Sequence, residues 1–324
     1  MRRWDDVTEV PSDLGPTAVT IGVFDGVHRG HQRVIGRTVE QARAHGAKAV
    51  VVTFDPHPTA VVRPDAVPPL LATVDRRLEL FEALGVDAAL VIPFDKERSQ
   101  QPAEEFVREL TDTLRPVAVV VGEDFRFGHK AKGDVALLRR LGERFGFTVE
   151  GLSRRVDAEL DRPAQAEAVS STVVRQRLEE GDVAGANELL GRLFEVEGTV
   201  VEGAHRGREL GYPTANVPPS PGMALPADGV YAGWLRRVDD GTKAGTPLPA
   251  AISVGTNPQF GHEPRRVEAY VLDRDDLELY GVRVVVSFVE RVRGQQRFDS
   301  VEALVAQMGE DVERIRQILD VPRP

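Results

Sequence analysis

Apolar positions in the first half of the chain fall in short continuous runs that alternate with amphipathic segments. The run at 47–54 is rich in valine, which is typical of a strand buried on both faces. We predict strands at 17–24, 47–54, 88–93, 117–121 and 147–152, and helices at 30–44, 75–84, 103–114 and 134–145. Repeated strand and helix units favour an open, doubly wound parallel sheet with helices on both faces.

The pattern changes after a helical stretch predicted at 171–190. Five strand-like runs then follow with few helices between them, at 194–203, 229–237, 250–254, 266–272 and 282–289. With a terminal helix at 300–319, they predict an antiparallel β-barrel or sandwich closed by that helix. The expected fold class is α/β, with a parallel-sheet domain over 1–186 and a barrel domain over 187–324. Gly191–Leu193 is the expected linker.

Composition supports this organisation and excludes several kinds of chemistry. A length of 324 residues fits two domains of roughly 150 residues each. The net charge of −10 repels nucleic acid and anionic membranes, so we expect neither as a partner. The chain has no cysteine, which excludes disulfides and thiolate chemistry. It has neither an apolar run of ~18 residues nor a secretory signal, so we expect a cytoplasmic protein and leave a homo-oligomer open.

The segment from Gly22 to His31 predicts a phosphate site. His28 and His31 lie three residues apart where a buried strand gives way to a helix, so both imidazoles should lie on one face of its first turn. Helix N-termini favour phosphate, and the glycines let the backbone approach a ligand closely. Zinc bound by this pair and His57 is an alternative, which would make the protein a metal-dependent hydrolase. The expected phosphate contacts in this segment are Gly22, Phe24, Asp25, Gly26 and Gly30.

Two further segments fit the same site. After the predicted strand at 117–121, Asp124 offers a polar contact beside Phe125 and Phe127, whose rings could wall a flat ligand or could be ordinary core aromatics. At the start of the predicted helix at 171, the hydroxyls of Ser171 and Thr172 and the guanidinium of Arg175 can reach a phosphate, although capping alone would also explain the hydroxyls.

These motifs resemble a known family. His28-Arg-Gly-His31 is similar to the His-x-Gly-His signature of the nucleotidyltransferase superfamily. The segments 122–128 and 170–175 are similar to the Gly-x-Asn/Asp-Phe-x-Phe-Gly and Ser-Ser-Thr-x-x-Arg motifs of the bacterial bifunctional riboflavin kinase/FMN adenylyltransferases. The resemblance implies that His28 and His31 are catalytic and that FMN is bound by Phe54, Pro56, His57, Asp124, Phe125 and Phe127.

The segment from Gly207 to Asn216 predicts a second site. Thr214 and Asn216 place two hard oxygen donors at i, i+2 spacing on an extended loop, as Mg²⁺ with a nucleotide requires, although a plain surface turn is the alternative. Pro213-Thr-Ala-Asn216 resembles the motif of riboflavin kinases whose Thr and Asn attend the metal and phosphates. The resemblance implies an ATP and riboflavin site made of Gly207, Gly211, Pro213, Thr214, Asn216, Asn257 and Arg293.

The candidate base of this second site is Glu268, on a predicted strand where alternation places it opposite Val267 and Ala269. It could deprotonate a primary hydroxyl for attack on a γ-phosphate, or simply pair with a nearby arginine. Arg293-Gly-Gln-Gln-Arg-Phe298 departs from the more usual Arg-Pro-Glu-x-Lys-Phe of the family, because the turn lacks its proline.

The resemblance implies a bifunctional enzyme of FAD synthesis. Riboflavin and ATP would give FMN and ADP in the C-terminal domain, and FMN and ATP would give FAD and pyrophosphate in the N-terminal domain. An adenylyl- or cytidylyltransferase acting on another phosphorylated metabolite is one alternative, because the His-x-Gly-His motif is shared across that superfamily. A non-enzymatic flavin or nucleotide sensor is another, although the charged candidate residues argue against it.

Overall fold

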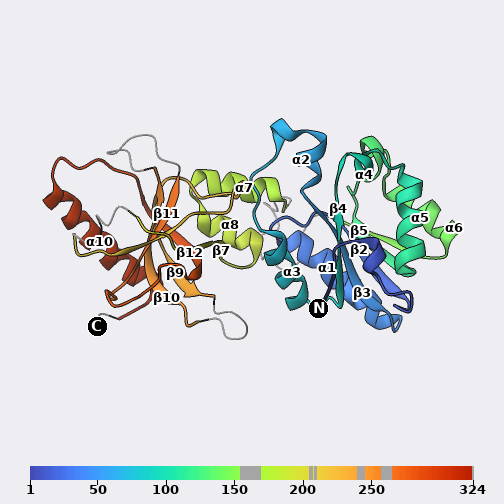
Figure 1. The fold of residues 1–324 in the computed structure, drawn as a ribbon, viewed down its shortest axis with the longest axis horizontal. Helices are drawn as coiled ribbons and strands as arrows, with labels where there is room; N and C mark the ends of the chain where they lie inside the picture. Colours follow the sequence, from blue (N-terminus) through green and yellow to red (C-terminus); the bar gives the residue numbers. More distant parts are fainter. Residues whose placement is uncertain (154–168, 204–206, 208–209, 239–244, 257–264, 323–324) are drawn as a thin grey trace. The chain divides into compact units, whose positions relative to one another are not determined.

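The chain folds into two compact units, Met1–Ser171 and Thr172–Pro324, which are described separately (Figure 1). The computed structural model describes residues 1–153, 169–203, 207, 210–238, 245–256 and 265–322. The division after Ser171 comes earlier in the chain than the expected boundary between residues 186 and 187. The helices that follow Ser171 pack with the second unit.

Six parallel strands form the sheet of the first unit, in the order β1-β4-β3-β2-β5-β6. Val50, Val51 and Val52 of β3 are fully buried, as expected for a strand covered on both faces. The predicted doubly wound parallel sheet is confirmed, while the sequence pattern missed the short edge strand β1. The strands are β1 (Arg2–Trp4), β2 (Thr17–Ile21), β3 (Lys48–Asp55), β4 (Ala88–Pro93), β5 (Pro116–Gly122) and β6 (Thr148–Leu152).

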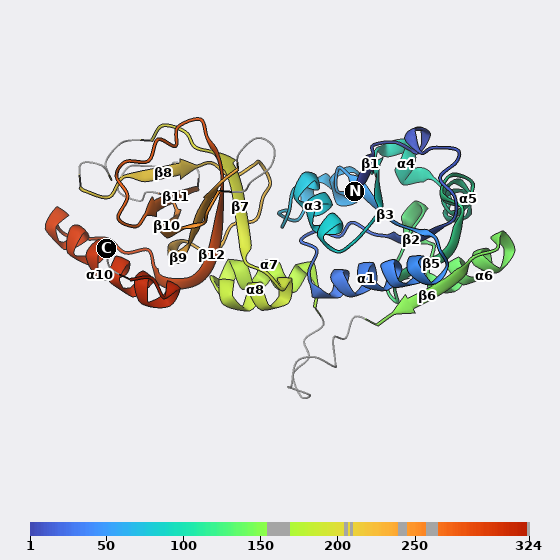
Figure 2. The ribbon, with the colours of Figure 1, turned by 90° about the horizontal axis from the view of Figure 1, so that it is seen from below.

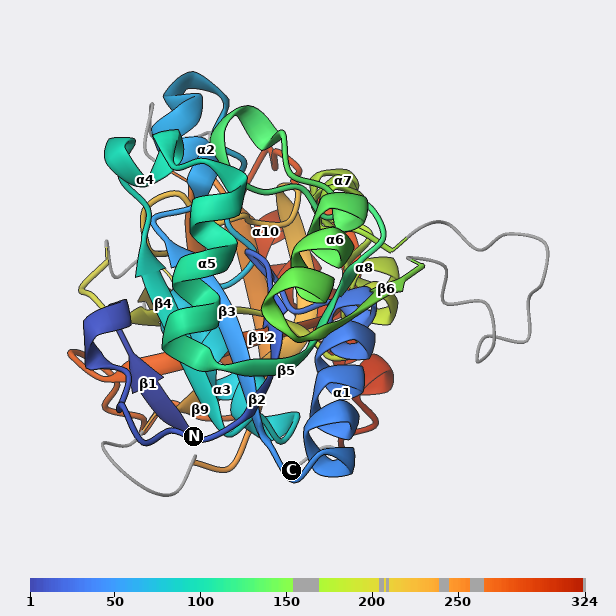
Figure 3. The ribbon, with the colours of Figure 1, turned by 90° about the vertical axis from the view of Figure 1, so that its right-hand side faces the viewer.

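Helices cover both faces of this sheet (Figures 2 and 3). On one face, Ile35 of α1 and Phe81 of α3 pack in one apolar cluster with Val51. On the other face, Phe106 of α5 and Leu138 of α6 pack in a second cluster. Each large buried side chain contributes about 2 kcal/mol by leaving water. The helices are α1 (Arg29–Ala44), α2 (Pro58–Val62), α3 (Val74–Ala83), α4 (Lys96–Gln100), α5 (Ala103–Leu114) and α6 (Val135–Phe145).

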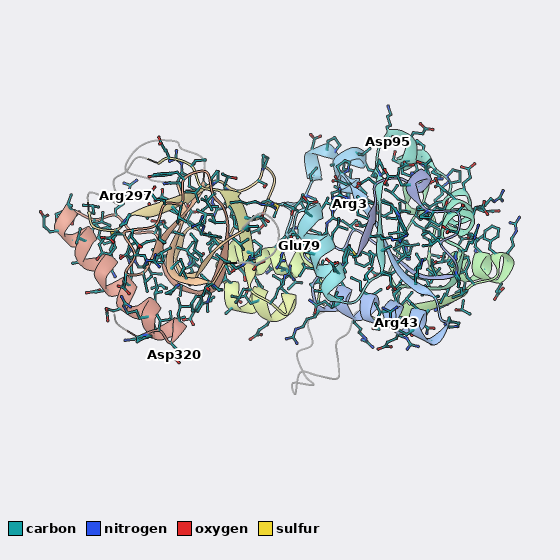
Figure 4. All side chains as sticks on the ribbon, turned by 60° about the horizontal axis from the view of Figure 1, so that its bottom comes forward. Arg3, Arg43, Glu79, Asp95, Arg297 and Asp320 are labelled. Atoms are coloured by element: carbon teal, nitrogen blue, oxygen red, sulfur yellow. The ribbon has the colours of Figure 1, made fainter. Side chains whose placement is uncertain are left out.

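Side-chain caps set where several of these helices begin. Thr73, Asp95 and Asp134 each accept a hydrogen bond from the backbone N–H three residues on, which satisfies a donor that the first helical turn cannot. Arg43 of α1 and Glu79 of α3, both labelled in Figure 4, are exposed on the outer surfaces of their helices. The helix boundaries therefore follow from local chemistry that the sequence displays.

Six antiparallel strands form the sheet of the second unit, in the order β7-β12-β9-β10-β11-β8. Val201, just past β7, forms an isolated bridge with Asn216 of β8, so the two edges of the sheet approach each other as in a partly closed barrel. This confirms the predicted antiparallel barrel. The strands are β7 (Phe194–Thr199), β8 (Thr214–Val217), β9 (Gly229–Arg237), β10 (Leu248–Gly255), β11 (Arg266–Val271) and β12 (Arg283–Gly294).

Among the described residues, the three helices α7, α8 and α10 belong with this second sheet. The helical stretch predicted over 171–190 is two helices, α7 (Ser171–Glu180) and α8 (Val183–Leu190), because Gly181 has a φ of 80° and Asp182 caps a new helix. Gly191 ends α8 in a left-handed conformation within the second unit. The terminal helix α10 (Val301–Leu319) begins after its cap Ser300, as predicted, and packs through Ile315 against the sheet.

Candidate active sites

The first candidate site lies where the strand order of the parallel sheet reverses. From the central β2 the chain continues to β3 and β4 on one side, and then returns to β5 on the other. Ligands of doubly wound sheets bind outside the carboxyl ends of the strands at such a point. The predicted residues follow the carboxyl ends of three adjacent strands: Gly22 to His31 after β2, Pro56 and His57 after β3, and Asp124 to Phe127 after β5.

The glycine loop, residues 22–28, has an unusual backbone. Phe24, Gly26 and Val27 have φ values of 53°, 78° and 42°, all in the left-handed region. For Phe24 and Val27 this conformation is costly and persists only where surrounding contacts hold it. The Phe24 ring packs edge-on against Phe81 of α3 with ring centroids 5.7 Å apart. A Cβ on Gly22 would lie 2.9 Å from the Phe24 ring, so the loop requires glycine there.

The two histidines lie together at the N-terminus of α1, as predicted. His28 is the N-cap and is buried, and its Nδ1 accepts a hydrogen bond from the backbone N–H of His31 at 3.3 Å. The rings stack with centroids 3.6 Å apart and an interplanar angle of 17°. Because Nδ1 is the acceptor, a neutral His28 carries its proton on Nε2. A Cβ on Gly30 would lie 3.2 Å from the His28 ring, which explains the glycine between the histidines.

Asp25 and Ser171 shape the glycine loop. The Asp25 carboxylate is buried and accepts the backbone N–H groups of Leu71 at 2.9 Å and Ala72 at 3.2 Å. The Ser171 hydroxyl donates to the Asp25 carbonyl at 2.9 Å. These bonds give both residues a structural role that the sequence did not suggest, and their phosphate contacts stay predictions. Thr172 and Arg175 belong to the second unit, so their phosphate contacts also stay predictions.

Aromatic rings gather at the carboxyl ends of β3, β4 and β5. Phe125 and Phe127 are stacked at 5.3 Å, and Phe127 continues through Phe106 to Phe54. Phe94, just after β4, meets the Phe54 ring edge-on at 5.6 Å. Phe127 is buried in the core, whereas Phe54 and Phe125 are partly exposed and offer ring surface to a ligand. Sequence reasoning missed Phe94 and Phe106, which carry no motif.

His57 and Asp124 lie at the margins of this site. The Nδ1 atom of His57 accepts the backbone N–H of Thr59 at 3.1 Å and thereby caps α2. Asp124 is exposed, and its Oδ1 would lie 3.0 Å from a Cβ on Gly122. In the described part of the chain, no group of three His, Cys, Asp or Glu side chains could hold a metal ion. The zinc alternative built on His28, His31 and His57 thus gains no support.

The second candidate site is a row of side chains across the edge of the antiparallel sheet. Asn216 of β8 lies opposite Glu268 of β11, which in turn lies opposite Ser253 of β10. Thr214, two residues before Asn216, shares its face and lies opposite Tyr270. Thr214 and Asn216 were expected on a loop, but they form a strand paired with the strand of Glu268. Directly opposed residues have Cβ atoms roughly 5 Å apart, so the three candidate residues are neighbours.

A pocket opens beside this row. Thr214 and Asn216 line it together with the predicted Gly207 and Pro213, whereas Glu268 is not among its lining residues. The residues Arg274, Asp275, Leu277 and Leu279, which carry no motif, line it as well. Asn216 therefore connects the pocket with Glu268, because it lines the pocket and lies opposite Glu268 in the sheet. The predicted Asn257 lies outside the described residues.

Glycines make room for the polar groups of this pocket. A Cβ on Gly207 would lie 2.4 Å from the Tyr212 carbonyl oxygen and 3.5 Å from the Thr214 hydroxyl. Gly211 has a φ of 85°, which favours glycine in the turn before the strand. A Cβ on Gly203 would lie 2.1 Å from the amide nitrogen of Asn216. Gly203 was missed by sequence reasoning, because a glycine in a loop has many explanations.

Comparison with known proteins decides the family. Residues 10–172 match the FAD synthetase family, and residues 190–319 match the riboflavin kinase family. The chain is 34% identical over 307 residues to the bifunctional riboflavin kinase/FMN adenylyltransferase of Escherichia coli strain K12, covering 94% of each protein. It is 38% identical over 301 residues to the Pseudomonas fluorescens enzyme of the same name, covering 92% of each. The chain belongs to the bifunctional riboflavin kinase/FMN adenylyltransferase family.

The fold of this family member has a solved relative. A crystal structure described as a macrolide-efflux protein from Streptococcus pneumoniae is 29% identical, with a TM-score of 0.83, and the match covers 97% of this chain and 98% of that one. In the part of the chain that the structure describes, no helix is long and apolar enough to cross a membrane. The family matches over residues 10–172 and 190–319 confirm the predicted resemblance for both halves of the chain.

Arg293 has a different setting from the flavin contact expected in the kinase half. Its guanidinium forms a bidentate ion pair with Asp311 of α10, with Nε 2.9 Å and Nη2 2.7 Å from Asp311 Oδ2. Nη1 donates to the Gly294 carbonyl at 3.1 Å, and the guanidinium lies 5.7 Å from the Phe298 ring centre. The Asp311 side chain is only 7% exposed. These contacts give Arg293 the role of fastening α10 to β12, and its flavin contact stays a prediction.

Proposed function

We propose that each unit of this bifunctional riboflavin kinase/FMN adenylyltransferase performs one reaction at the site described above. The second unit phosphorylates riboflavin with ATP to give FMN and ADP. The first unit joins FMN to the adenylyl group of ATP, which gives FAD and pyrophosphate. The observation that carries this assignment is the separation of the sites: the histidine pair lies at the start of α1 in the first unit, and the Thr214, Asn216 and Glu268 row lies on the antiparallel sheet of the second unit.

In the kinase reaction, Glu268 is the base. Its carboxylate accepts the proton of the 5′-hydroxyl of riboflavin, the hydroxyl oxygen attacks the γ-phosphorus of ATP, and ADP leaves. Thr214 and Asn216 fit Mg²⁺, because both present hard oxygen donors on one face and Gly203 and Gly207 leave a cradle that a Cβ would fill. When bound there, Mg²⁺ neutralises the charge of the phosphates.

In adenylyl transfer, the histidines at the start of α1 stabilise charge. A phosphate oxygen of FMN attacks the α-phosphorus of ATP in line, and pyrophosphate leaves. The Nδ1 atom of His28 accepts the backbone N–H of His31, so the proton of a neutral His28 lies on Nε2. This Nε2–H is the donor to an oxygen of the α-phosphate. The partly exposed rings of Phe54 and Phe125 suit the flat ring system of FMN. No step requires a covalent enzyme intermediate.

Cellular setting follows from the substrates. We infer that the enzyme works in the cytoplasm, where ATP is made, and that riboflavin, FMN, FAD and ATP are its small-molecule partners. A net charge of −10 gives no general attraction for nucleic acid or anionic membranes, so anions are drawn by local groups such as helix ends, histidine and arginine.

The decisive experiment supplies riboflavin and MgATP and separates the flavins by chromatography. The wild-type protein should form FMN and then FAD. Glu268→Ala should form no FMN but should convert supplied FMN to FAD at the wild-type rate. His28→Ala with His31→Ala should accumulate FMN and form no FAD. In each variant the retained activity shows that the unmutated unit is folded, and a wild-type thermal transition shows that the mutated unit is folded as well.

Other outcomes would redirect the assignment. A Glu268→Ala protein with normal kinase turnover would remove Glu268 as the base, and unchanged FAD formation after loss of both histidines would remove the histidine site. Adenylyl transfer to a different phosphorylated metabolite, with none to FMN, would indicate another nucleotidyltransferase. Flavin binding without turnover would indicate a sensor.

A further inference from the structure

Arg77 of α3 is a buried cation directly behind the first active site. Only 4% of the surface of Arg77 is exposed to solvent. Burial lowers its pKa below the ordinary value, and the charges of Asp25 and Asp55 act in the opposite direction. Its Nε has no hydrogen-bond partner among the described residues. Transfer of a charged side chain from water into the protein interior costs free energy, so a buried arginine is expected to have a specific role.

The Arg77 fork connects the carboxyl ends of two strands. Nη1 donates to the Val23 carbonyl at 2.5 Å and to the Thr53 hydroxyl at 2.9 Å, and Nη2 lies 3.4 Å from the Phe54 carbonyl. Val23 belongs to the glycine loop after β2, and Phe54 is at the end of β3. Thr53 itself donates to the Val23 carbonyl at 3.1 Å. One side chain therefore joins the loop that leads to His28 with the strand end that carries the aromatic surface.

Residues from 71 to 81 hold the glycine loop on both sides of its strained position. Before Phe24, the Val23 carbonyl is bound by Arg77. After Phe24, the Asp25 carboxylate is bound by backbone N–H groups of residues 71 and 72. The Phe24 ring itself lies against Phe81, one turn beyond Arg77 on α3. Opposed contacts of this kind over-determine a left-handed conformation that the chain would otherwise leave.

The path from Arg77 to the histidines is short. Val27 N–H donates to the Phe24 carbonyl at 3.0 Å, which closes a tight turn over residues 24–27, directly before His28. Gln32 of α1 donates to the Val27 carbonyl at 2.8 Å and fixes the other side of that turn. A displacement at Val23 is thus carried through one turn to the N-cap of α1, where the two imidazoles stack.

We propose that Arg77 is a positioning residue for adenylyl transfer, which sets the His28 loop and the Phe54 strand end in one geometry. The inference rests on the proposed function of this site. Because Arg77 lies behind the backbone, it acts through the loop rather than by touching the phosphates. Its planar fork matters as much as its charge, since a single ammonium cannot bond both strand ends with the same geometry.

The test compares three single variants in the intact bifunctional chain. Arg77→Met removes the charge and the fork, and Arg77→Lys keeps the charge alone. Arg76→Met is the matched control, because the neighbouring Arg76 pairs with exposed Glu79 on the surface of the same helix. The measured quantity is the kcat of FAD formation from FMN and MgATP, divided by the kcat of riboflavin phosphorylation in the same sample. The ratio cancels differences in protein concentration, and it is divided by the folded fraction of the first unit, taken from its thermal transition, because the two activities lie in separate units.

We expect the ratio to fall by about 10- to 100-fold in Arg77→Met and about 10-fold in Arg77→Lys, with KM values for FMN and ATP within about 3-fold of wild type. Arg76→Met should keep the wild-type ratio. A merely stabilising role would lower the thermal midpoint and the folded fraction of the first unit but would leave the ratio, once divided by that fraction, at the wild-type value, and that result would overturn the proposal.

Two further outcomes are decisive. If Arg77→Met fails to fold, Arg77→Lys decides, and a wild-type ratio in that variant defeats the inference. A wild-type chain that forms no FAD would defeat the proposed function of the site instead, whatever the Arg77 variants do. Equal losses of both activities in Arg77→Met but not in Arg76→Met would also overturn a role confined to adenylyl transfer.

Discussion

Gly203→Ala tests the kinase site with the smallest change the chain allows. The new Cβ would lie 2.1 Å from the amide nitrogen of Asn216, 2.7 Å from its Cγ and 2.9 Å from its Oδ1. Side-chain contacts of this kind are not made below 3.0 Å, so the amide must retreat by about 0.9 Å or rotate away. Asn216 lies opposite Glu268 and is one of the two proposed Mg²⁺ donors.

A misplacement of about 1 Å in a positioned group costs on the order of 100-fold in rate, or about 2.7 kcal/mol of activation free energy. We therefore expect Gly203→Ala to lower kcat/KM of riboflavin phosphorylation by about 100-fold. The assay follows FMN formation from riboflavin at varied MgATP concentration. Conversion of supplied FMN to FAD should remain at the wild-type rate, because the histidine site lies in the other unit.

Gly245→Ala is the matched control for this prediction. Gly245 lies in the same unit, and its Cβ would make only ordinary contacts with Arg237 at 3.5 Å. Its kinase activity should be that of the wild type. Kinase activity of Gly203→Ala within about 2-fold of wild type would show that the observed position of the Asn216 amide is not required for phosphoryl transfer, and the reasoning about this cradle would fail.

Three other expectations concern stability and flavin binding. Arg293→Ala leaves Asp311 buried without its cation and should cost about 3 kcal/mol in chemical denaturation; a cost near zero would contradict a fastening role. Burial acts to raise the pKa of Glu109, but hydrogen bonds led by that from Arg98 lower it below the ordinary 4.5. A carboxylate with a lowered pKa stabilises the fold at pH values above its pKa in the unfolded chain, and this stabilisation is lost as the pH falls through its pKa in the folded protein. Glu109→Gln should therefore reduce the free energy of unfolding at pH 7 and make that free energy depend less on pH below 4.5. An unchanged dependence of stability on pH would exclude this role. Phe125→Leu should raise KM for FMN in FAD formation by about 10-fold without changing riboflavin phosphorylation, and an unchanged KM would remove the ring from the FMN site.

Local chemistry explains why much of the first site could be predicted. The spacing of His28 and His31 places both on one helical turn, and a helix N-terminus engages the first ring as a cap whatever the surrounding fold. The alternation of Val-rich runs with amphipathic segments was sufficient for the parallel sheet, because buried strands and surface helices differ in their hydrophobic period. The same reasoning located Glu268 on a strand with its neighbours facing the core.

The contacts that the sequence did not reveal are made with partners distant in the chain. The Asp25 carboxylate, whose phosphate contact stays a prediction, binds backbone N–H groups 46 and 47 residues away. Arg77 has the pattern of an ordinary helical arginine, and only its contacts with Val23 and Thr53 distinguish it. Arg293, whose flavin contact stays a prediction, pairs with Asp311, 18 residues away. No periodicity or motif records such pairings.

By itself the sequence determined the order and type of most elements, the existence of two units and the motifs that name the family, because hydrophobic period, helix caps and short motifs are properties of neighbouring residues. Tertiary structure alone decided which strands adjoin. It placed Asn216 opposite Glu268 through the β8–β11 register and set Arg77 behind the glycine loop through the packing of α3. Register and packing depend on hydrogen bonds and contacts between segments far apart in the chain, so they arise only when the whole unit has folded.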